Sequence, residues 1–180
     1  MGEIGNIITG STPNTNIRDN YGGEFLFVSP IDIQGNRYVN TTITTLTKKG
    51  FNQCRNVKAK ASLFVSIGST IGKVAQSNKE LTTNQQINAV EPYESYDEDY
   101  TYTTLENIAD KVKSIASTQA VPIVNKTTFS EIEILITNQV EEQKKLGCLF
   151  AYLDRLITLH QRKLEKLQNL KQACLAKLFV

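Results

Sequence analysis

The sequence predicts an α+β protein, a globular domain of mixed strands and helices followed by a long C-terminal coiled-coil helix. Three observations predict this fold. The last fifth of the chain repeats apolar residues at steps of three and four, a helical period. Short β-prone runs separated by Gly, Pro and Asn fill the first half, and a single amphipathic pattern follows them. We therefore expect a domain over residues 1–137 and a helix over residues 138–180.

Length and composition are those of a soluble chain with one domain and an extension. The chain has 180 residues, of which 40% are hydrophobic. No apolar run is long enough to span a membrane, and the N-terminus has no signal pattern. Three cysteines at unrelated spacings imply neither a disulfide framework nor a zinc site. The expected location is cytoplasmic.

The strands are expected where β-prone residues are bounded by turn formers. Gly10 and the Thr12–Asn16 loop end the first strand, and Tyr21–Gly23 is predicted as a turn before the second. Residues 34–50, rich in Thr and Asn, favour short edge strands and loops over a helix. The expected strands cover residues 4–8, 24–28, 60–67, 74–75 and 87–90.

The segment Gly68–Lys73 superficially suggests a phosphate-binding loop. However, only three residues separate its glycines instead of four, and Val74 stands where Ser or Thr is required. We interpret the segment as a hairpin turn between two strands.

An amphipathic helix is expected over residues 95–115. Ser95 and Glu98 have capping-box spacing, and apolar residues then step by four and three. Pro122 ends this segment. Residues 123–124 and 129–136 are predicted to be extended and to lead into the tail helix.

The tail contains no Gly or Pro after Gly147, so it predicts a helix about 60 Å long at about 1.5 Å per residue. The steps around His160 are two fours in succession, a stutter that locally unwinds a supercoil. Packing on the chain's own domain is one explanation, but a narrow seam on so long a helix favours an intermolecular coiled coil. The apolar seam consists of Leu146, Leu149, Leu153, Leu156, His160, Leu164, Leu167, Cys174 and Leu178, with Leu170 or Lys171 completing the spacing.

The net charge of +2 hides a segregation of charges along the chain. Residues 37–79 contain bases and no acid, whereas residues 91–110 contain acids and no base. The two blocks predict a polarised surface with one face available to phosphates. A solvated basic face without a ligand is the alternative.

Constellations for catalysis are not found in the sequence. His160, the only histidine, lies in the apolar seam, where packing is the simpler role, and no pair of histidines could hold a metal. The acids Asp97–Asp99 fall at a helix start, where they favour the helix dipole. The stretch Asn88–Tyr93 lacks the consecutive prolines of the motif with which amino-methyltransferases handle a flipped base. Neither a catalytic nor a metal site is therefore expected.

Side chains that bind DNA are better represented. Asn and Gln can bond adenine, Arg and Lys can bond guanine or phosphate, and Ser and Thr serve either. A structural role for the loop amides, tying loops to backbone, is the alternative at each position. The candidate DNA-binding residues are Thr12, Asn14, Thr15, Lys48, Lys49, Arg55, Ser69, Thr70, Lys73, Thr83, Asn84, Gln85 and Gln86.

Five blocks of the sequence, in order, resemble the specificity subunit of type I restriction–modification systems. Thr9–Thr15 is similar to that family's opening Thr-Gly-x-Thr-Pro loop. The remaining blocks are Tyr21–Gly23 with Phe27–Ile33, Gly68–Ala75, Thr83–Ala89, and a helix with Glu142–Gln143, Leu153–Ile157 and Gln161–Glu165. Each block is weak alone, but their order covers nearly the whole chain.

The resemblance implies a target-recognition domain that reads half of a bipartite DNA site, followed by a spacer helix. That helix would pair antiparallel with its counterpart and dock modification subunits, which carry S-adenosylmethionine and methylate adenine. A restriction subunit can join the same assembly. The chain itself would bind no cofactor and catalyse nothing.

The sequence departs from the family because it has one domain and one helix where members usually have two of each. It is therefore expected to be a half-subunit or a fragment. A half-subunit that forms a homodimer through its helix would favour a palindromic interrupted site. The residues before Glu142 also lack the family's prolines. The alternative function is a coiled-coil assembly or regulatory protein whose degenerate domain no longer reads DNA, and a stand-alone enzyme is a third, weaker hypothesis.

Overall fold

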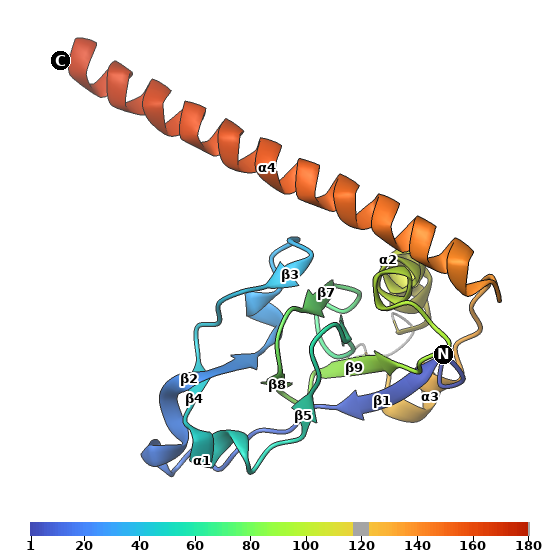
Figure 1. Cartoon of the computed structure of the whole chain (residues 1–180). Helices are drawn as coiled ribbons and strands as arrows, with labels where there is room; N and C mark the ends of the chain where they lie inside the picture. The colour runs from blue at the N-terminus through green and yellow to red at the C-terminus, as the bar shows by residue number, and fades with distance from the viewer. Residues whose placement is uncertain (117–122, 180) are drawn as a thin grey trace.

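The computed structural model describes residues 1–116 and 123–179 of the chain. Two β-sheets and a helix stack in layers, and a second, much longer helix leaves the domain at one end (Figure 1). The strands are β1 (Gly5–Thr9), β2 (Tyr21–Val28), β3 (Tyr38–Val39), β4 (Thr45–Leu46), β5 (Asn56–Val57), β6 (Ser62–Val65), β7 (Val74–Ser77), β8 (Leu81–Thr83) and β9 (Ile87–Pro92). The helices are α1 (Lys48–Phe51), α2 (Glu98–Ala116), α3 (Lys126–Ser130) and α4 (Val140–Leu178), with short 3-10 turns at Arg18–Asn20 and Pro30–Asp32. This mixed architecture confirms the predicted α+β class.

The first sheet has the strand order β1-β9-β6-β7-β3. Its strands pair antiparallel except β3, which runs parallel to β7 at the edge. The second sheet has the order β4-β2-β8-β5, in which β2 and β8 are parallel. Both parallel pairs join strands that lie far apart in the sequence.

Alternation along the strands of the first sheet divides its side chains between two cores. Phe64 and Val90 point to α2, whereas Leu63, Val65 and Ala89 point to the second sheet. All five are fully buried. This two-sided burial explains why the predicted strands 60–67 and 87–90 are almost continuously apolar.

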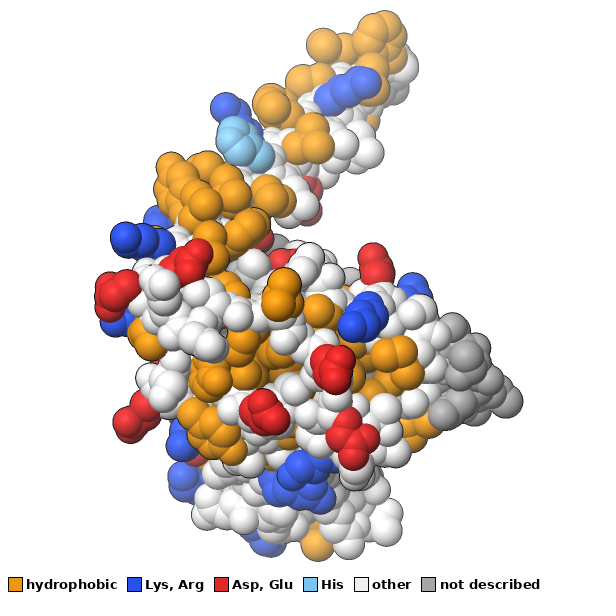
Figure 2. Space-filling model, turned by 90° about the vertical axis from the view of Figure 1, so that its right-hand side faces the viewer, with side chains coloured by type: hydrophobic (Ala, Val, Ile, Leu, Met, Phe, Trp, Pro, Cys, Tyr) orange, Lys and Arg blue, Asp and Glu red, His pale blue; other side chains and the backbone are white. Residues whose placement is uncertain are grey.

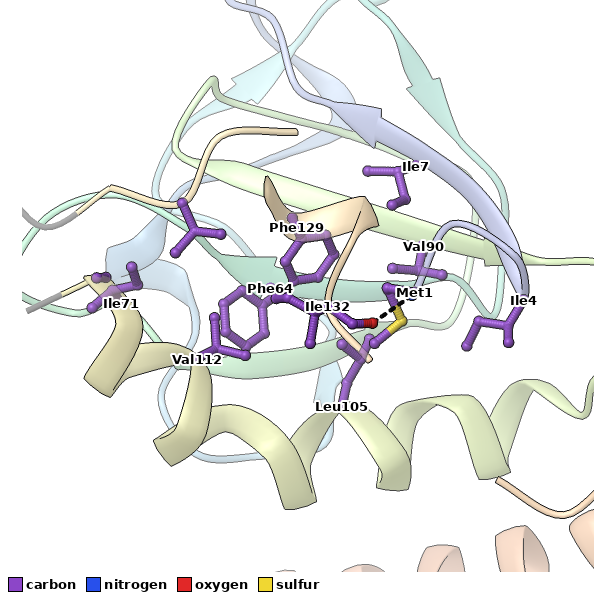
Figure 3. Close-up of a cluster of buried hydrophobic side chains, with 12 residues drawn as sticks. Met1, Ile4, Ile7, Phe64, Ile71, Val90, Leu105, Val112, Phe129 and Ile132 are labelled. Carbon is purple, nitrogen blue, oxygen red and sulfur yellow. Dashed lines mark hydrogen bonds between the residues drawn. The ribbon is translucent and has the colours of Figure 1, made fainter. Parts of the chain in front are cut away.

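Figure 3 shows the core between the first sheet and α2. Leu105 and Val112 of α2 pack there with Phe64, whose ring centre lies 5.1 Å from that of Phe129. The backbone ammonium of Met1 donates to the carbonyl of Ile132 at 2.6 Å. The chain's N-terminal segment and the segment that leads into α4 are thus joined at this core.

The hairpin interpretation of Gly68–Lys73 is confirmed. The segment connects the antiparallel strands β6 and β7, and Gly68 and Gly72 both have a φ of 92°. This left-handed conformation suits glycine, which has no Cβ to clash. The expected turn at Tyr21–Gly23 instead lies within β2, where Gly22 has a φ of 83° and the register against β4 shifts. It is a bulge inside a strand.

Two expectations about the helical segments were wrong in detail. The N-cap of α2 is Asp97, whose Oδ1 accepts from the backbone N–H of Tyr100 at 2.8 Å, in place of Ser95. Phe129, expected in an extended segment, lies in α3, which Asn125 caps through the N–H of Thr128. The predicted terminator Pro122 lies outside the described residues.

The long tail helix is confirmed as α4, a helix of 39 residues and about 58 Å at the standard rise. It begins at Val140, two residues after the expected start. Its first turns lie on α2, and the rest extends away from the domain (Figure 1). Packing on the chain's own domain therefore accounts for the first turns of α4, whereas the intermolecular coiled coil stays a prediction for the rest of the helix.

Candidate nucleic-acid interface

Several predicted DNA-binding residues come together where four loops meet. The hydroxyl of Thr12 donates to Oε1 of Gln85 at 2.6 Å, although 73 residues separate them. Arg55 lies beside this contact, since its guanidinium donates to the carbonyl of Thr9 at 2.8 Å and its N–H to the hydroxyl of Ser11 at 2.9 Å. The first loop, the segment before β5 and the β8–β9 turn thus form one surface.

The hairpin turn adds a shallow hollow of about 410 Å³ to this surface. Lys73 donates from Nζ to the carbonyl of Ile33 at 2.9 Å, which ties the hairpin to the Pro30–Asp32 turn. The hollow is open and lined by polar and apolar groups together, as a surface that accepts a base edge would be. Its lining residues are Ser29, Pro30, Ile31, Gln34, Thr70, Lys73 and Gln86.

Hydrogen bonds within the β8–β9 turn hold its side-chain amides in place. The side chain of Asn84 accepts from the N–H of Gln86 at 3.0 Å and donates to Oε1 of Gln86 at 3.0 Å. Asn84 therefore serves the turn itself, while Gln85 is exposed. Thr83 is fully buried in β8, so the structure does not place its side chain on the surface with the others.

Lys48 and Lys49 lie on α1, at the other end of the same loop system. Nζ of Lys48 stands 5.1 Å from the ring centre of Phe25, and Lys49 pairs with Asp19 at 3.7 Å on the exposed surface. Asn20 connects α1 to the first loop through its side chain and its backbone carbonyl. It donates to the carbonyl of Asn14 at 3.1 Å, while the N–H of Thr47 donates to the carbonyl of Asn20 at 3.0 Å.

The loop tip of Asn14 and Thr15 is exposed, as is Ser69. Tyr21 steadies this loop, because its hydroxyl donates to the carbonyl of Pro13 at 2.9 Å. Burial raises the pKa of Tyr21 and of Cys54, which lies against Ser11. Both groups therefore stay protonated at neutral pH and add no negative charge to this surface.

The expected polarised surface is only partly formed, because some residues of the basic block pair with acids. Arg37 and Lys60 both contact Asp99, and Lys58 lies 3.8 Å from Glu91. The charges of these bases are therefore balanced by neighbouring acids.

One part of the loop surface was missed from the sequence. Ile31 is 60% exposed at the rim of the hollow, and the amide of Gln34 donates to its carbonyl. A signal was available, because Ser29 and Asp32 have the spacing of a capping box. The structure contains this box, in which Asp32 accepts from both the N–H and the hydroxyl of Ser29.

A second feature is the joint between the domain and α4. Gln143 is fully buried, accepts from the N–H of Asp97 at 2.9 Å and donates to the carbonyl of Thr137 at 2.8 Å. Next to it, Gly147 fits so closely that an added Cβ would lie 2.5 Å from Oδ1 of Asp97. The helix backbone is therefore seated directly on the N-cap of α2.

Arg37 completes the joint from the side of the first sheet. Its guanidinium pairs with Asp99 of α2 at 2.9 Å and with Asp154 of α4 at 2.8 Å. The same group lies over the ring of Tyr102, 4.2 Å from its centre, and donates to Gln76 of β7. One buried side chain thus connects the sheet to both helices.

Burial also raises the pKa of Glu106, with Asp154 adding to the effect and Tyr102 and Arg37 opposing it. The pKa of Tyr102 is raised by burial and by Glu106 and Asp154.

The apolar seam of α4 is largely open. Leu146 and Leu156 are half-buried, whereas Leu149, Leu153, His160, Leu164, Leu167 and Leu178 are exposed. Figure 2 shows hydrophobic side chains gathered along the helix where it leaves the domain.

Among residues 1–116 and 123–179, no cluster of three or more His, Cys, Asp or Glu side chains is arranged to hold a metal ion. Within the same part of the chain, none of the helices combines the length and hydropathy needed to cross a membrane.

A family model for the type I restriction modification DNA specificity domain matches residues 1–169. The chain belongs to this family. The match takes in both the loop surface and the joint, so the specificity domain includes most of α4.

Two curated relatives are similar to this specificity domain. The MjaIX type I restriction enzyme specificity subunit of Methanocaldococcus jannaschii is 27% identical over 173 residues, which cover 93% of this chain and 40% of the relative. The HindI specificity subunit of Haemophilus influenzae is 30% identical over 139 residues, or 75% of this chain and 30% of the relative. The chain thus spans less than half the length of either.

Solved structures confirm the fold of the specificity domain. The S subunit of a type I restriction–modification system from M. genitalium superposes with a TM-score of 0.72 at 16% identity, covering 97% of this chain and 43% of that one. A specificity subunit from Thermoanaerobacter tengcongensis superposes with a TM-score of 0.67 at 17% identity. The superposition covers 98% of this chain and 42% of that subunit. Both comparisons include a sheet domain followed by a long helix.

Proposed function

We propose that this chain recognises one half-site of a bipartite DNA sequence within a type I restriction–modification methyltransferase complex. The observation that carries the proposal is the family match over residues 1–169, which coincides with a surface of polar loops. Because the chain spans less than half of its relatives, its partners and target are part of the proposal.

Phosphates would be held by the exposed amines of Lys48 and Lys49 on α1. The guanidinium N–H groups of Arg55 that do not donate to the carbonyl of Thr9 would also bind phosphate. Bases would be read by Thr12 and Gln85, by Ser69 and Thr70 at the hairpin, and by the amide of Gln86 in the hollow. Lys73 and Asn84 fix the shapes of these loops through the bonds described above.

The chain would contribute no catalysis. Double-stranded DNA and a modification subunit are its proposed partners, with S-adenosylmethionine bound by that subunit, which methylates adenine. A restriction subunit would join the same complex. One of the similar solved structures concerns complex assembly and conformational transition of the type I R-M system, and it covers 98% of this chain at a TM-score of 0.71.

Reversing the charge of Lys48 and Lys49 together tests the DNA-binding surface. The double change to Glu is expected to weaken binding to all duplexes alike. It should also reduce the salt dependence, log K against log[salt], by about 0.9 for each phosphate that the variant no longer neutralises. The measurement is fluorescence anisotropy with the duplex selected from a random library, at several salt concentrations.

Lys126→Glu is the matched control, since Lys126 is exposed on α3 at the far end of the domain from α1 (Figure 1). Unchanged binding by the Lys48/Lys49 double variant, with the control also unchanged, would remove α1 from the interface.

We further propose that α4 joins two copies of the chain through the apolar seam. Leu164 is 57% exposed, and no contact with the domain covers it. Leu164→Asp is expected to leave a monomer at micromolar concentration, because a carboxylate buried without a partner is costly. Light scattering measures the mass, and Asn169→Asp, about 140° around the helix, is the control with the same charge. A Leu164→Asp protein that still forms dimers would refute pairing through this seam.

The second candidate function is an assembly or regulatory protein that no longer reads DNA. The exposed apolar seam of α4 favours it, because a helix can pair through this seam without DNA being bound. The two candidates differ in one result. A wild-type chain that forms complexes but selects no sequence from a random duplex library would support the second.

A further inference from the structure

The spacing of the apolar seam is symmetric about His160. Counting outward, seam positions occur four, seven and fourteen residues away on both sides, at Leu156 and Leu164, Leu153 and Leu167, and Leu146 and Cys174. At eleven residues, Leu149 is matched by Lys171. The symmetry ends beyond this span, because Glu142 is the counterpart of Leu178. From Leu146 to Cys174 the spacing reads the same in both directions, and such a segment is complementary to an antiparallel copy of itself, since in a two-fold interface residue i contacts j and j contacts i.

Antiparallel pairing of α4 is what the family resemblance implies, and we propose that the two-fold axis relating two copies of this chain passes at His160. The inference rests on the proposed homodimer and adds its register. In this register Leu156 faces Leu164 of the other copy, Leu153 faces Leu167, and the two His160 side chains meet at the axis.

The stutter of the seam selects this register over its neighbours. Leu156, His160 and Leu164 follow one another at two steps of four, and this stretch is locally less supercoiled than a regular heptad pattern. Among antiparallel registers, only an axis at His160 sets the stutter of one helix against the stutter of the other. A shift by one heptad would set it against regular heptads with a different winding.

The charges beside the seam also agree with this register. Lys145 and Lys163 border the seam, and Lys171 lies within it. With the axis at His160, these lysines face Leu175, Ile157 and Leu149 of the other copy. Their methylene stems can cover the apolar side chains while the amines reach solvent. A parallel pairing in register would instead set Lys171 against itself.

The position of the domain leaves room for the second copy. Gln143, Gly147 and Asp154, which contact the domain, lie about 100–140° around the helix from the middle of the seam, at about 100° per residue. The second helix would therefore lie on the side of α4 away from its own domain. The two joints, each centred near Gly147, would be separated by about 40 Å along the paired helices.

Disulfide trapping tests the register. In a background with Cys54→Ser and Cys148→Ser, Leu146→Cys is expected to cross-link to the native Cys174 of the other copy, giving a covalent dimer under mild oxidation. Leu153→Cys is the control, because it meets Cys174 only if the pairing shifts by one heptad. Preferential cross-linking through Leu153→Cys would overturn the proposed axis.

Charge complementation tests the axis itself. His160→Glu and His160→Lys are each expected to be monomers, since each variant places two like charges together at the axis. Their equimolar mixture is expected to form a heterodimer, detected by native mass spectrometry. Complementation would fail in any register in which residue 160 does not face itself.

The failures of the two proposals can be told apart. If the wild-type chain is a monomer at every accessible concentration, the homodimer and its register fall together, while the DNA-binding test on Lys48 and Lys49 is unaffected. If the wild type is a dimer, but Leu146→Cys gives no cross-link and the two His160 variants form no heterodimer, only the register is wrong.

Discussion

Replacing Arg37 by alanine is expected to lower the free energy of unfolding by about 3–5 kcal/mol, the cost of removing one partner from a buried ion pair. Arg37 is 4% exposed and pairs with Asp99 and Asp154. Its loss would remove the counter-charge of Asp154, leave Asp99 with Lys60 at 3.6 Å, and take from the buried Gln76 the donor to its Oε1. Arg37→Lys is expected to recover only part of the loss, because an ammonium cannot make these separate bonds in the same geometry.

Urea unfolding followed by circular dichroism measures this change. Lys144→Ala is the matched control, since it removes a surface pair with Glu141 one turn away on α4, for which the cost should be under about 1 kcal/mol. An Arg37→Ala protein as stable as the control would show that the joint does not depend on this charge.

The same variant should be most destabilised at neutral pH. Burial raises the pKa of Glu106, Asp154 raises it further, and the positive charge of Arg37 lowers it. A carboxyl with a raised pKa in the folded state opposes folding once it is ionised, so its cost appears as the pH rises through that pKa. Without Arg37 the pKa should rise further, and the difference from wild type should shrink between pH 7 and pH 4.5. An equal difference at both values would contradict this account.

Replacing Gly147 by alanine should loosen α4 from the domain, although alanine ordinarily stabilises a helix by about 1 kcal/mol relative to glycine. The added Cβ would lie 2.5 Å from Oδ1 of Asp97 and 2.7 Å from the backbone nitrogen of Tyr100. Relief requires either a shift of the helix or loss of the Asp97 cap, so we expect a net loss of about 1–3 kcal/mol.

Hydrogen exchange locates the effect of Gly147→Ala. Protection should fall in the first turns of α4 and in the first turn of α2, and remain unchanged in the first sheet. Cys148→Ala, at the exposed neighbouring position, should change neither protection nor stability by more than about 0.5 kcal/mol. A Gly147→Ala protein that gains stability would mean that the close approach is relieved without cost.

The features that could be predicted from the sequence are those encoded locally. The long helix follows from its period, the β6–β7 hairpin from its glycines, and the buried strands from their apolar runs. The short strands β5 and β8 and the helices α1 and α3 were missed because two to five residues carry no period. Their existence depends on partners elsewhere, such as the parallel pairing of β8 with β2.

The site shows the same division. Polar loops could be identified from composition, and Thr12 and Gln85 do meet in space. The sequence did not show that Thr83 is buried while Gln85 is exposed, because this depends on β8 lying in the interior of a sheet. Arg37 was grouped with the basic block, because its ion-pair partners lie 62 and 117 residues away. Electrostatic pairing over such separations has no signature in a single sequence.

The joint described by Arg37, Gln143 and Gly147 makes α4 a lever whose fulcrum lies at one end. Because the helix is about 58 Å long, a tilt of 10° at the joint would displace its far tip by about 10 Å, or roughly three base-pair steps of a duplex. Angular error at the fulcrum is thus magnified into an error of position. Ion pairs and a close steric fit at the joint restrict the angle between α4 and the domain more than apolar contacts alone would. The far end of the helix is therefore held in a defined position relative to the domain.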